Sequence, residues 1–387
     1  MRVLHVMQAL TPATGTTDFL VQLLRSLASA TDCEVALMTL NDYGFEMPGV
    51  KIYSRFDQIP AAEVPDVVHV HALWHPQLTQ AHLWAQKRGI PVVVSPHGAL
   101  SPWAMSSKRF KKLPYWLLFE RWNLKRAAAF HVTAELEGEW VRDRGFHQRQ
   151  YLVPLGVNLP AEASQSQLTP RVILYVGRIY SVKGLDRIAE AIRILQKRGL
   201  WHGWHMVMAG PDWLDYQATF EQKLASLGLT FTHSNLLDDQ VAQLGPVSPQ
   251  SETQNQKLET VAIDISLPGA VYGEAKANLF RAASIYVQAS HTENFAQPVA
   301  EALSYGVPVI AAKGTPWAKV VEHGCGFWVE NSPEMLADAL AEMMAKSDDE
   351  RRKMGARGRE WMAKDFSWPA VGRRMFAAYR DVVTTRA

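Results

Sequence analysis

The stretch of sequence that decides the fold reads His291-Thr292-Glu293-Asn294-Phe295-Ala296-Gln297-Pro298-Val299-Ala300-Glu301. The apolar run 285–290 precedes it and predicts a buried strand, and the pattern 302–305 that follows predicts a helix ending at Gly306. A strand, a polar loop and a helix start are therefore expected in that order. Because the first amides of a helix lack intrahelical partners, such a start attracts anions. Pro298 suits the first helical turn, where its missing N–H costs nothing.

Charged side chains follow two of the predicted strands. Glu293 lies in the loop and Glu301 on the second helical turn, so both carboxylates can face one crevice. The loop 177–184, between a predicted strand and the predicted helix 185–197, carries Arg178 and Lys183. Open α/β sheets bind ligands at this carboxyl end, and an Arg fork with a Lys point charge can hold a diphosphate. The alternative is a solvated loop with two cations.

Length and composition indicate a two-domain globular protein. The chain has 387 residues, which suits two domains of roughly 150–200 residues. Its net charge of +2 dictates no partner, and no nucleic-acid partner is expected. The two cysteines favour neither a disulfide framework nor a zinc site, and a reducing compartment is the default. Without a recognisable signal peptide or an 18-residue apolar run, we expect a cytoplasmic protein that does not span a membrane.

Strand-like and helix-like patterns alternate twice along the chain, which predicts two doubly wound parallel sheets. We expect a first domain over 1–160, a linker over 161–170 and a second domain over 171–366. An irregular insert at about 234–264 is predicted to be disordered or a surface excursion rather than a lid. A last helix, over 367–387, follows the completed second sheet pattern.

The order Gly-Arg-x4-Lys-Gly followed by Glu-x7-Glu resembles that of the retaining nucleotide-sugar glycosyltransferases of the GT-B class, family 4, also described as glycosyl transferases group 1. The resemblance extends to the stretches 269–276, 301–310 and 314–317, and it favours the polysaccharide and O-antigen biosynthesis type. It implies a GT-B fold, in which two Rossmann-like domains face a central crevice. It also implies that the last helix crosses back to the first domain.

The resemblance assigns roles to individual residues. Arg178 and Lys183 would bind the donor diphosphate, Glu301 the ribose hydroxyls, and Glu293 the transferred sugar as a catalytic contact. The remaining donor-binding positions are the backbone amides of Asn294, Phe295 and Ala296, and Gly15 in the first domain. Two departures matter: Ala296 stands where the family commonly has Gly, and many relatives have two adjacent glycines around Gly15.

His97, in Ser95-Pro96-His97-Gly98, ends a predicted strand of the first domain. It matches the position at which many relatives place a catalytic or sugar-contacting histidine, and the alternative is a core or turn histidine. Ser101 and Trp103, which follow, are predicted to line the acceptor site. His69 and His71 alternate on a strand and are interpreted as structural, with a place in the cleft as the alternative.

The implied reaction moves a hexose or N-acetylhexosamine from a nucleotide-diphosphate sugar to a saccharide or lipid-linked saccharide, with retention at the anomeric carbon. No cofactor or metal is expected, because the two cations and the helix start can stabilise the leaving diphosphate. Asp238-Asp239 lacks Asp-x-Asp spacing and is interpreted as solvated. The alternatives are an epimerase or phosphorylase on the same fold, and a non-catalytic nucleotide-sugar-binding subunit.

Basic residues lie beside aromatic residues over 108–119, and Trp122, Lys125 and Arg126 continue the pattern. Such a surface can contact an anionic membrane. We therefore expect peripheral contact at the inner membrane face, which fits a lipid-linked acceptor. The alternative is an ordinary helix whose cations are solvated and in which Trp116, Leu117 and Trp122 are partly buried.

Overall fold

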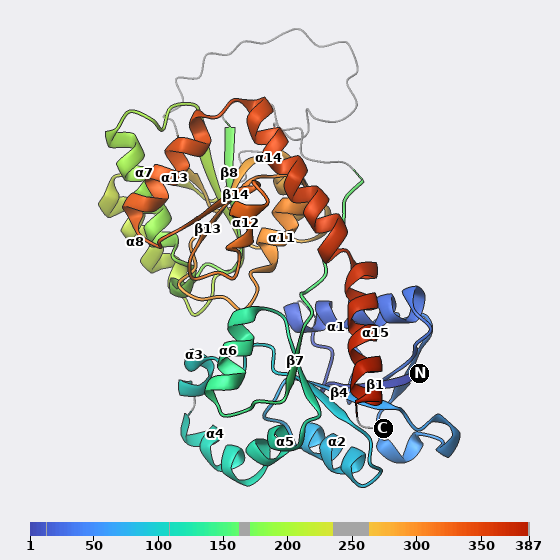
Figure 1. Cartoon of the computed structure of the whole chain (residues 1–387). Helices are drawn as coiled ribbons and strands as arrows, with labels where there is room; N and C mark the ends of the chain where they lie inside the picture. The colour runs from blue at the N-terminus through green and yellow to red at the C-terminus, as the bar shows by residue number, and fades with distance from the viewer. Residues whose placement is uncertain (13, 108, 162–170, 235–262, 386–387) are drawn as a thin grey trace. The chain divides into compact units, whose positions relative to one another are not determined.

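The computed structural model describes residues 1–12, 14–107, 109–161, 171–234 and 263–385. The chain forms two compact units, and each is built on a seven-stranded parallel sheet (Figure 1). Unit 1 comprises Met1–Gly156 and Lys364–Ala387, and unit 2 comprises Val157–Ala363. The predicted pair of doubly wound parallel sheets is confirmed. The predicted linker, apart from Ala161, lies outside the described residues, as do residues 235–262 of the predicted insert, which include Asp238-Asp239.

The sheet of unit 1 has the order β3-β2-β1-β4-β5-β6-β7. Its strands are β1 (Arg2–Val6), β2 (Glu34–Met38), β3 (Val50–Tyr53), β4 (Val67–His71), β5 (Val92–Ser95), β6 (Ala129–Val132) and β7 (Arg149–Leu152). Strand β3 was not predicted, because as an edge strand it buries none of its four residues and shows no apolar alternation. In the middle of the sheet, His5 of β1 lies opposite His69 of β4.

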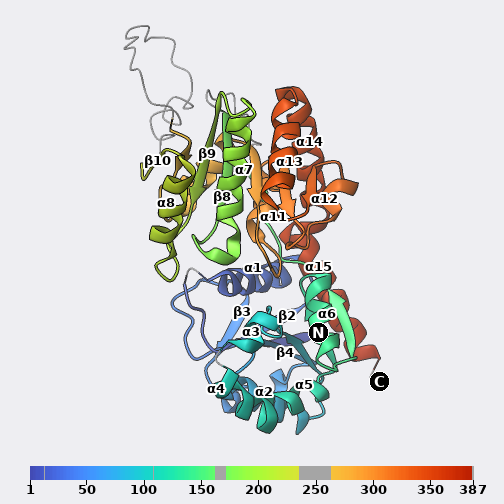
Figure 2. The ribbon, with the colours of Figure 1, turned by 90° about the vertical axis from the view of Figure 1, so that its left-hand side faces the viewer.

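Helices cover both faces of this sheet (Figure 2). They are α1 (Gly15–Ala30), α2 (Pro76–Gln86), α3 (Pro102–Ser106), α4 (Arg109–Tyr115), α5 (Arg121–Arg126), α6 (Glu135–Asp143) and α15 (Trp368–Thr384). Helices α1 and α15 share one apolar core, and α2, α5 and α6 contribute to the other. Ser26 of α1 donates to the carbonyl of Trp368 at 2.6 Å. A Cβ on Gly372 would lie 2.3 Å from Ser26 Oγ, so glycine permits this close helix contact.

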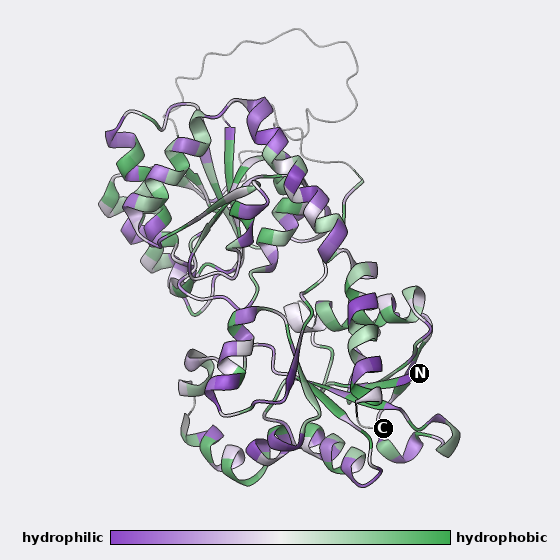
Figure 3. Cartoon of the chain, in the orientation of Figure 1, coloured by the Kyte–Doolittle hydropathy of each residue, from purple (hydrophilic) through white to green (hydrophobic). Residues whose placement is uncertain are grey.

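The sheet of unit 2 has the order β10-β11-β9-β8-β12-β13-β14. Its strands are β8 (Arg171–Val176), β9 (Trp204–Ala209), β10 (Phe231–Thr232), β11 (Ile265–Ser266), β12 (Ala283–Gln288), β13 (Val309–Ala312) and β14 (Gly326–Val329). Its helices are α7 (Leu185–Lys197), α8 (Tyr216–Leu227), α10 (Gly273–Ala282), α11 (Gln297–Ser304), α12 (Lys319–Glu322), α13 (Pro333–Ala345) and α14 (Asp348–Trp361). Hydrophobic residues concentrate on the central strands of both units (Figure 3). The very short β10 and β11 flank residues 235–262 in sequence.

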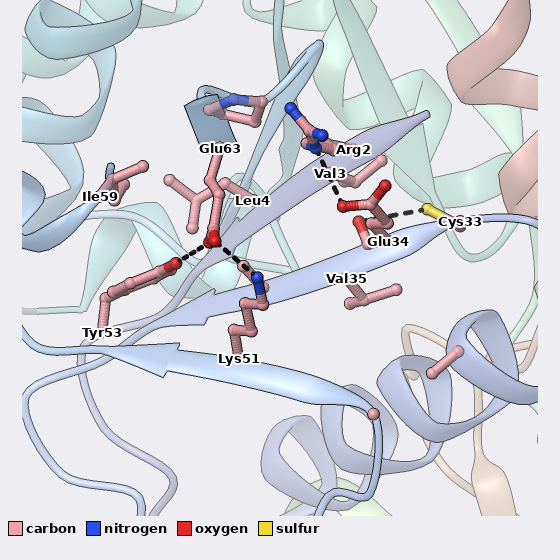
Figure 4. Close-up of a pocket in the computed structure, with 14 residues that line it drawn as sticks. Arg2, Val3, Leu4, Cys33, Glu34, Val35, Lys51, Tyr53, Ile59 and Glu63 are labelled. Atoms are coloured by element: carbon pink, nitrogen blue, oxygen red, sulfur yellow. Dashed lines mark hydrogen bonds and ion pairs between the residues drawn. The ribbon is translucent and has the colours of Figure 1, made fainter. Parts of the chain in front are cut away.

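A pocket in unit 1 lies between the beginnings of β1 and β2 and the edge strand β3 (Figure 4). Its charged groups compensate one another: Arg2 Nε donates to Glu34 at 2.9 Å, and Lys51 Nζ lies 2.7 Å from Glu63. Tyr53 donates to the second oxygen of Glu63 at 2.6 Å. Arg2 and Glu34 begin their strands, whereas open α/β sheets bind ligands at the carboxyl ends. This pocket is therefore separate from the site described next.

Candidate functional site

The loop after β12 in unit 2 is held between two neighbouring loops by backbone hydrogen bonds. The N–H of His291 donates to the carbonyl of Val182 at 2.9 Å, and the N–H of Glu293 donates to the carbonyl of Gly314 at 2.9 Å. These three segments follow β8, β12 and β13, which are neighbours in the sheet. The fold thus gathers them at the carboxyl end of the sheet, where ligands bind in open α/β proteins.

Lys183 and Glu293, which are 110 positions apart in sequence, form an ion pair at this carboxyl end of the sheet. Lys183 ends a short 3-10 helix, and its side chain is only 12% exposed, against 14% for Glu293. Gly184 permits the close approach, because its φ is +66° and a Cβ there would lie 2.0 Å from the carbonyl oxygen of Ala289. Two residues predicted to act on one donor are therefore brought together.

A row of buried polar side chains on β12 and just after its end supports Glu293. Ser290 donates to Glu293 Oε1 at 2.8 Å, and Gln288 Nε2 donates to Ser290 Oγ at 2.8 Å. Tyr286 OH in turn donates to Gln288 Oε1 at 2.6 Å. These supporting residues were not predicted. Their spacing of two along an apolar strand places them on one face and was the signal available in the sequence.

Glu301 lies on the second turn of α11, as predicted. Lys276 of α10 donates to its Oε1 at 2.8 Å. Its Oε2 is buried and accepts no hydrogen bond within the described part of the chain. A buried carboxylate oxygen without a donor is costly, and a ligand hydroxyl would satisfy it. Lys276 is a further charged residue at the site to which the sequence assigned no role.

Arg178 follows β8 and extends toward solvent. Its guanidinium carbon lies 4.7 Å from the centre of the Trp213 ring, within the range of a cation–π contact. Its carbonyl accepts from Tyr175 OH at 2.9 Å. The Trp213 ring and the hydrogen bond to the Arg178 carbonyl limit the conformations of the exposed Arg178 side chain.

The segment 294–296 enters α11 through a strained turn. The Phe295 ring packs at 5.2 Å from that of Trp317, and Trp317 Nε1 donates to the Phe295 carbonyl at 2.5 Å. Ala296 adopts φ 60° and ψ 63°, a left-handed conformation that favours glycine. Asn294 is half-buried before it, and Pro298 lies in the first helical turn as predicted. Phe295 thus anchors the turn through its side chain.

The other predicted site residues belong to unit 1. Gly15 begins α1, and a Cβ there would meet no described atom within 4 Å. Ser101 accepts from the N–H of Ala104 at 3.2 Å and so supports the start of α3. Trp103 lies within α3.

His97 occupies a tight turn directly after β5. Its φ is +51°, and the following Gly98 has φ +76°. Gly98 N–H donates to Glu137 Oε1 at 2.6 Å, and Thr133 N–H donates to the other oxygen of Glu137 at 2.8 Å. Ser101 N–H donates to the Gly98 carbonyl at 3.1 Å. The buried Glu137, which the sequence did not single out, therefore holds the turn that presents His97.

The His97 ring is tied to the core of unit 1. Its Nε2 lies 3.1 Å from Nδ1 of His71, which is fully buried, as is His69. The edge of Phe19, from α1, faces the ring at 5.5 Å between centroids. Burial lowers the pKa of His97 to about 3 and those of His69 and His71 well below the usual value. All three rings are therefore neutral at physiological pH.

The two units offer different chemistry. Unit 2 presents three cations, Arg178, Lys183 and Lys276, and two carboxylates at the carboxyl end of its sheet. This set suits a ligand with both an anionic group and several hydroxyls. Unit 1 presents a neutral histidine on a rigid turn, which suits a polar contact to a hydroxyl.

Curated relatives match parts of the chain. A D-inositol 3-phosphate glycosyltransferase from Thermobispora bispora is 28% identical over 236 residues, covering 59% of this chain and 45% of the relative. A GDP-mannose-dependent alpha-(1-6)-phosphatidylinositol dimannoside mannosyltransferase from Mycobacterium tuberculosis is 23% identical over 310 residues, covering 76% and 68%. The match thus spans about half to two-thirds of the length of these relatives.

Solved structures share the fold over nearly the whole chain. Anabaena HepE in complex with UDP and glucose is 14% identical, with a TM-score of 0.69 and coverage of 98% of this chain and 100% of that one. Sucrose-phosphate synthase from Thermosynechococcus elongatus is 17% identical, with a TM-score of 0.67 and coverage of 100% of both. The predicted GT-B class, with two Rossmann-like domains, is confirmed.

Two family models match the chain in sequence order. One described as glycosyl transferase 4-like domain matches residues 8–156. The other, described as glycosyl transferases group 1, matches residues 161–361, which is more than half of the chain and includes Arg178, Lys183, Glu293 and Glu301. The chain therefore belongs to the glycosyl transferases group 1 family.

Proposed function

We propose that this protein transfers a hexose or N-acetylhexosamine from a nucleotide-diphosphate sugar to a hydroxyl of a saccharide or lipid-linked saccharide, with retention of anomeric configuration. In this proposal Lys183 and Arg178 bind the diphosphate, and Glu301 binds the ribose. Glu293 contacts the transferred sugar, and the amides of 294–296 face the phosphate. His97 contacts a substrate hydroxyl.

The observation that carries the proposal is the ion pair between Lys183 and Glu293. The charges of two side chains that are only 12% and 14% exposed compensate each other at the carboxyl end of the sheet, where α/β proteins bind ligands. A diphosphate brings acceptor oxygens to the ammonium, and sugar hydroxyls bring donors to the carboxylate. A nucleotide sugar can thus satisfy both groups at once, whereas a simple anion satisfies only Lys183.

Charge that develops on the leaving diphosphate is stabilised in this proposal by Lys183, Arg178 and the start of α11, and no metal or cofactor is required. Fixed charges in a site that excludes water stabilise such charge strongly. Retention is supported by the resemblance to retaining enzymes alone.

The test is a panel of UDP, GDP and ADP and their sugars, measured by calorimetry and then by transfer to saccharide acceptors with and without EDTA. We expect one nucleoside diphosphate to bind, and its sugar to be transferred in the presence of EDTA. Epimerisation without acceptor, phosphorolysis, or binding without any turnover would contradict the proposal. Transfer abolished by EDTA and restored by Mg²⁺ or Mn²⁺ would contradict its metal independence.

The lipid-linked form of the acceptor is supported by the segment 109–126 of unit 1. Phe110 is 89% exposed and Leu118 66%, beside Lys111 and other cations. Of the three side chains for which the alternative expects partial burial, Trp116 packs against an apolar core of unit 1, whereas Leu117 and Trp122 are 53% and 55% exposed. No helix among the described residues has the length and hydropathy that a bilayer crossing requires. We propose that this exposed surface contacts the membrane that carries the acceptor.

A further inference from the structure

Five histidines of unit 1 form one hydrogen-bonded chain with Ser95 and Tyr379. They come from β1, β4, β5, β6, α15 and the turn after β5, so the tertiary fold alone assembles them. The links are His131 Nε2 to Val153 O 2.8 Å, His131 Nδ1 to Ser95 Oγ 2.6 Å, Ser95 Oγ to His69 Nε2 2.7 Å, His69 Nδ1 to Tyr379 OH 2.6 Å, Tyr379 OH to His5 Nε2 3.4 Å, His5 Nδ1 to His71 Nε2 2.9 Å, and His71 Nδ1 to His97 Nε2 3.1 Å.

The hydrogen bond between His131 and Val153, at the end opposite His97, determines which group donates in each of the other hydrogen bonds. A carbonyl oxygen can only accept, so the hydrogen of His131 lies on Nε2, facing Val153, and its Nδ1 is an acceptor. Ser95 must then donate to His131 and accept from Nε2 of His69. Because His69 Nδ1 is left as an acceptor, Tyr379 donates to it.

The same logic continues from Tyr379 to the surface. Its oxygen accepts from Nε2 of His5, so Nδ1 of His5 accepts from Nε2 of His71. Nδ1 of His71 then accepts from Nε2 of His97. If every ring is neutral and every link is made, only this arrangement satisfies the chain. Among the described residues, no group forms a hydrogen bond with Nδ1 of His97, which is left as the acceptor at the end of the chain.

We propose that this chain positions His97 as the Nε2–H tautomer, so that Nδ1 accepts a hydrogen bond from a substrate hydroxyl. Tyr379, on α15, is then a positioning residue. By donating to His69 and accepting from His5, it makes the donor order around His5, His71 and His97 follow from that around His131, Ser95 and His69. The tautomer follows from the contacts between neutral rings, whereas its consequence for turnover rests on the function proposed above for His97.

The donor order holds only if every ring is neutral, and burial keeps the rings neutral. Desolvation lowers the pKa of His5 to about 3 and that of His131 to about 4, so each ring carries one N–H hydrogen at neutral pH. The chain also ends at a carbonyl that takes up no proton at this pH. It therefore orients His97 and does not conduct protons out of the site.

A metal site is the competing interpretation, since ring nitrogens of His5, His69 and His71 lie within 4.8 Å of one another. However, all six ring nitrogens of these residues already belong to the chain. A metal would need the lone pairs on Nδ1 of the three rings, which accept hydrogen bonds from His71, Tyr379 and His97. Zinc binding is thus an outcome of the test that would overturn the proposal.

The direct test is long-range ¹H–¹⁵N correlation spectroscopy of the full chain labelled with ¹⁵N-histidine at pH 7.5, which distinguishes the two neutral tautomers. The His97 signals are assigned by their loss in His97→Gln. We expect His97 as the Nε2–H form before any substrate is added. An Nδ1–H form, a charged ring, or histidine signals that shift on stoichiometric Zn²⁺ uptake would overturn the proposal.

The second test compares two tyrosine hydroxyls: that of Tyr379, which is on α15, and that of Tyr151, which bonds to a residue of α15. Tyr379→Phe removes one hydroxyl from the chain, whereas Tyr151→Phe removes a hydroxyl that bonds to Asp381 on the same helix outside the chain. We expect Tyr379→Phe to give mixed His97 tautomers and a roughly five- to tenfold lower kcat, with unchanged nucleotide affinity. Tyr151→Phe should change neither. A single Nε2–H tautomer in Tyr379→Phe would overturn the role of Tyr379. If His97→Ala keeps full activity while the tautomer is as expected, only the proposed function of His97 fails.

Discussion

At the scale of single residues, Ala296 combines a small side chain with a conformation that favours glycine. Its φ of 60° costs a residue with a Cβ about 1–2 kcal/mol. Glycine would remove that strain but would lose about 0.5–1 kcal/mol in backbone entropy on folding. The two effects nearly cancel, so the alanine is tolerated at the start of α11.

We therefore predict that Ala296→Gly changes the free energy of unfolding by less than about 1 kcal/mol. The matched control is Ala300→Gly, within α11 and fully buried, which should destabilise by about 1.5–2 kcal/mol through lower helix propensity and a lost methyl group. Urea unfolding of both variants measures the difference. Equal destabilisation would contradict the strained conformation of Ala296.

Variants of Lys183 and Glu293 distinguish the compensation of the two charges, which affects stability, from contacts to the ligand, which affect affinity. Lys183→Ala should weaken nucleoside-diphosphate affinity roughly ten- to a hundredfold, because a charge-assisted hydrogen bond contributes about 1.5–3 kcal/mol. It should also lower stability, because Glu293 keeps only Ser290 as a hydrogen-bond donor among the described side chains. Adding Glu293→Gln should recover stability but not affinity.

Calorimetry and urea unfolding of the single and double variants test this prediction. The control is Arg198→Ala, which removes an exposed ion pair with Asp338 elsewhere in unit 2 and should leave affinity unchanged. Recovery of nucleotide affinity in the double variant would show that Lys183 does not contact the ligand.

At the scale of elements, the segment from α4 to α5 combines continuous helix with an unusual apolar surface. Pro114 lies inside α4, and a π-helical turn over Trp116–Glu120 follows it before α5. Proline removes a backbone donor, which disturbs the regular hydrogen-bond ladder. Glu120 is buried and accepts from the N–H of Trp74 at 2.9 Å, which fixes this turn on unit 1 while its apolar neighbours face solvent.

We predict that the protein binds anionic liposomes and that binding falls with salt, since each cation near the surface adds about 1 kcal/mol. The combined variant Lys111→Gln, Arg121→Gln, Lys125→Gln and Phe110→Ser should bind at least tenfold more weakly in sedimentation assays. The control removes exposed cations of unit 2, with Arg352→Gln and Lys353→Gln. Equal binding of both variants, or none at low salt, would refute membrane contact by this segment.

At the scale of the whole molecule, a change of pH should alter the stability of the two units unequally. Burial lowers the pKa values of seven histidines in unit 1. The pKa is about 3 for His5 and His97 and about 4 for His82 and His131, it lies well below the usual value for His69 and His71, and it is also lowered for His75. In the unfolded chain they titrate near 6.5, so below that pH unfolding takes up protons and stability falls. Burial raises the pKa of Glu120 to about 7, which acts in the opposite direction with a single proton. The histidines therefore dominate.

We predict that unit 1 loses several kcal/mol of stability between pH 6.5 and 4.5, at up to about 1.36 kcal/mol per pH unit for each histidine. Pulse labelling of thiols in urea measures this, because Cys33 is buried in unit 1 and Cys325 in unit 2. The labelling midpoint of Cys33 should fall much more than that of Cys325. His131→Asn should reduce the slope by about one proton, and equal shifts at both cysteines would contradict the prediction.

The sequence by itself determined the parallel sheets, most strand positions and the loops that carry Arg178, Lys183, Glu293 and Glu301. These features depend on local patterns: apolar runs for buried strands, turn residues between them, and charges placed after a strand. Edge elements such as β3 and β10 escaped prediction because a strand that buries little leaves little pattern.

Only the tertiary structure decided which side chains meet. The ion pair between Lys183 and Glu293 depends on β8 and β12 being neighbours, and their 110-residue separation carries no local signal. The histidine chain joins β1, β4, β5 and β6 to α15, so Tyr379 reaches His69 across 310 positions. The residues are visible in the sequence, but long-range packing determines their partners, and a buried polar group acquires its chemistry from those partners.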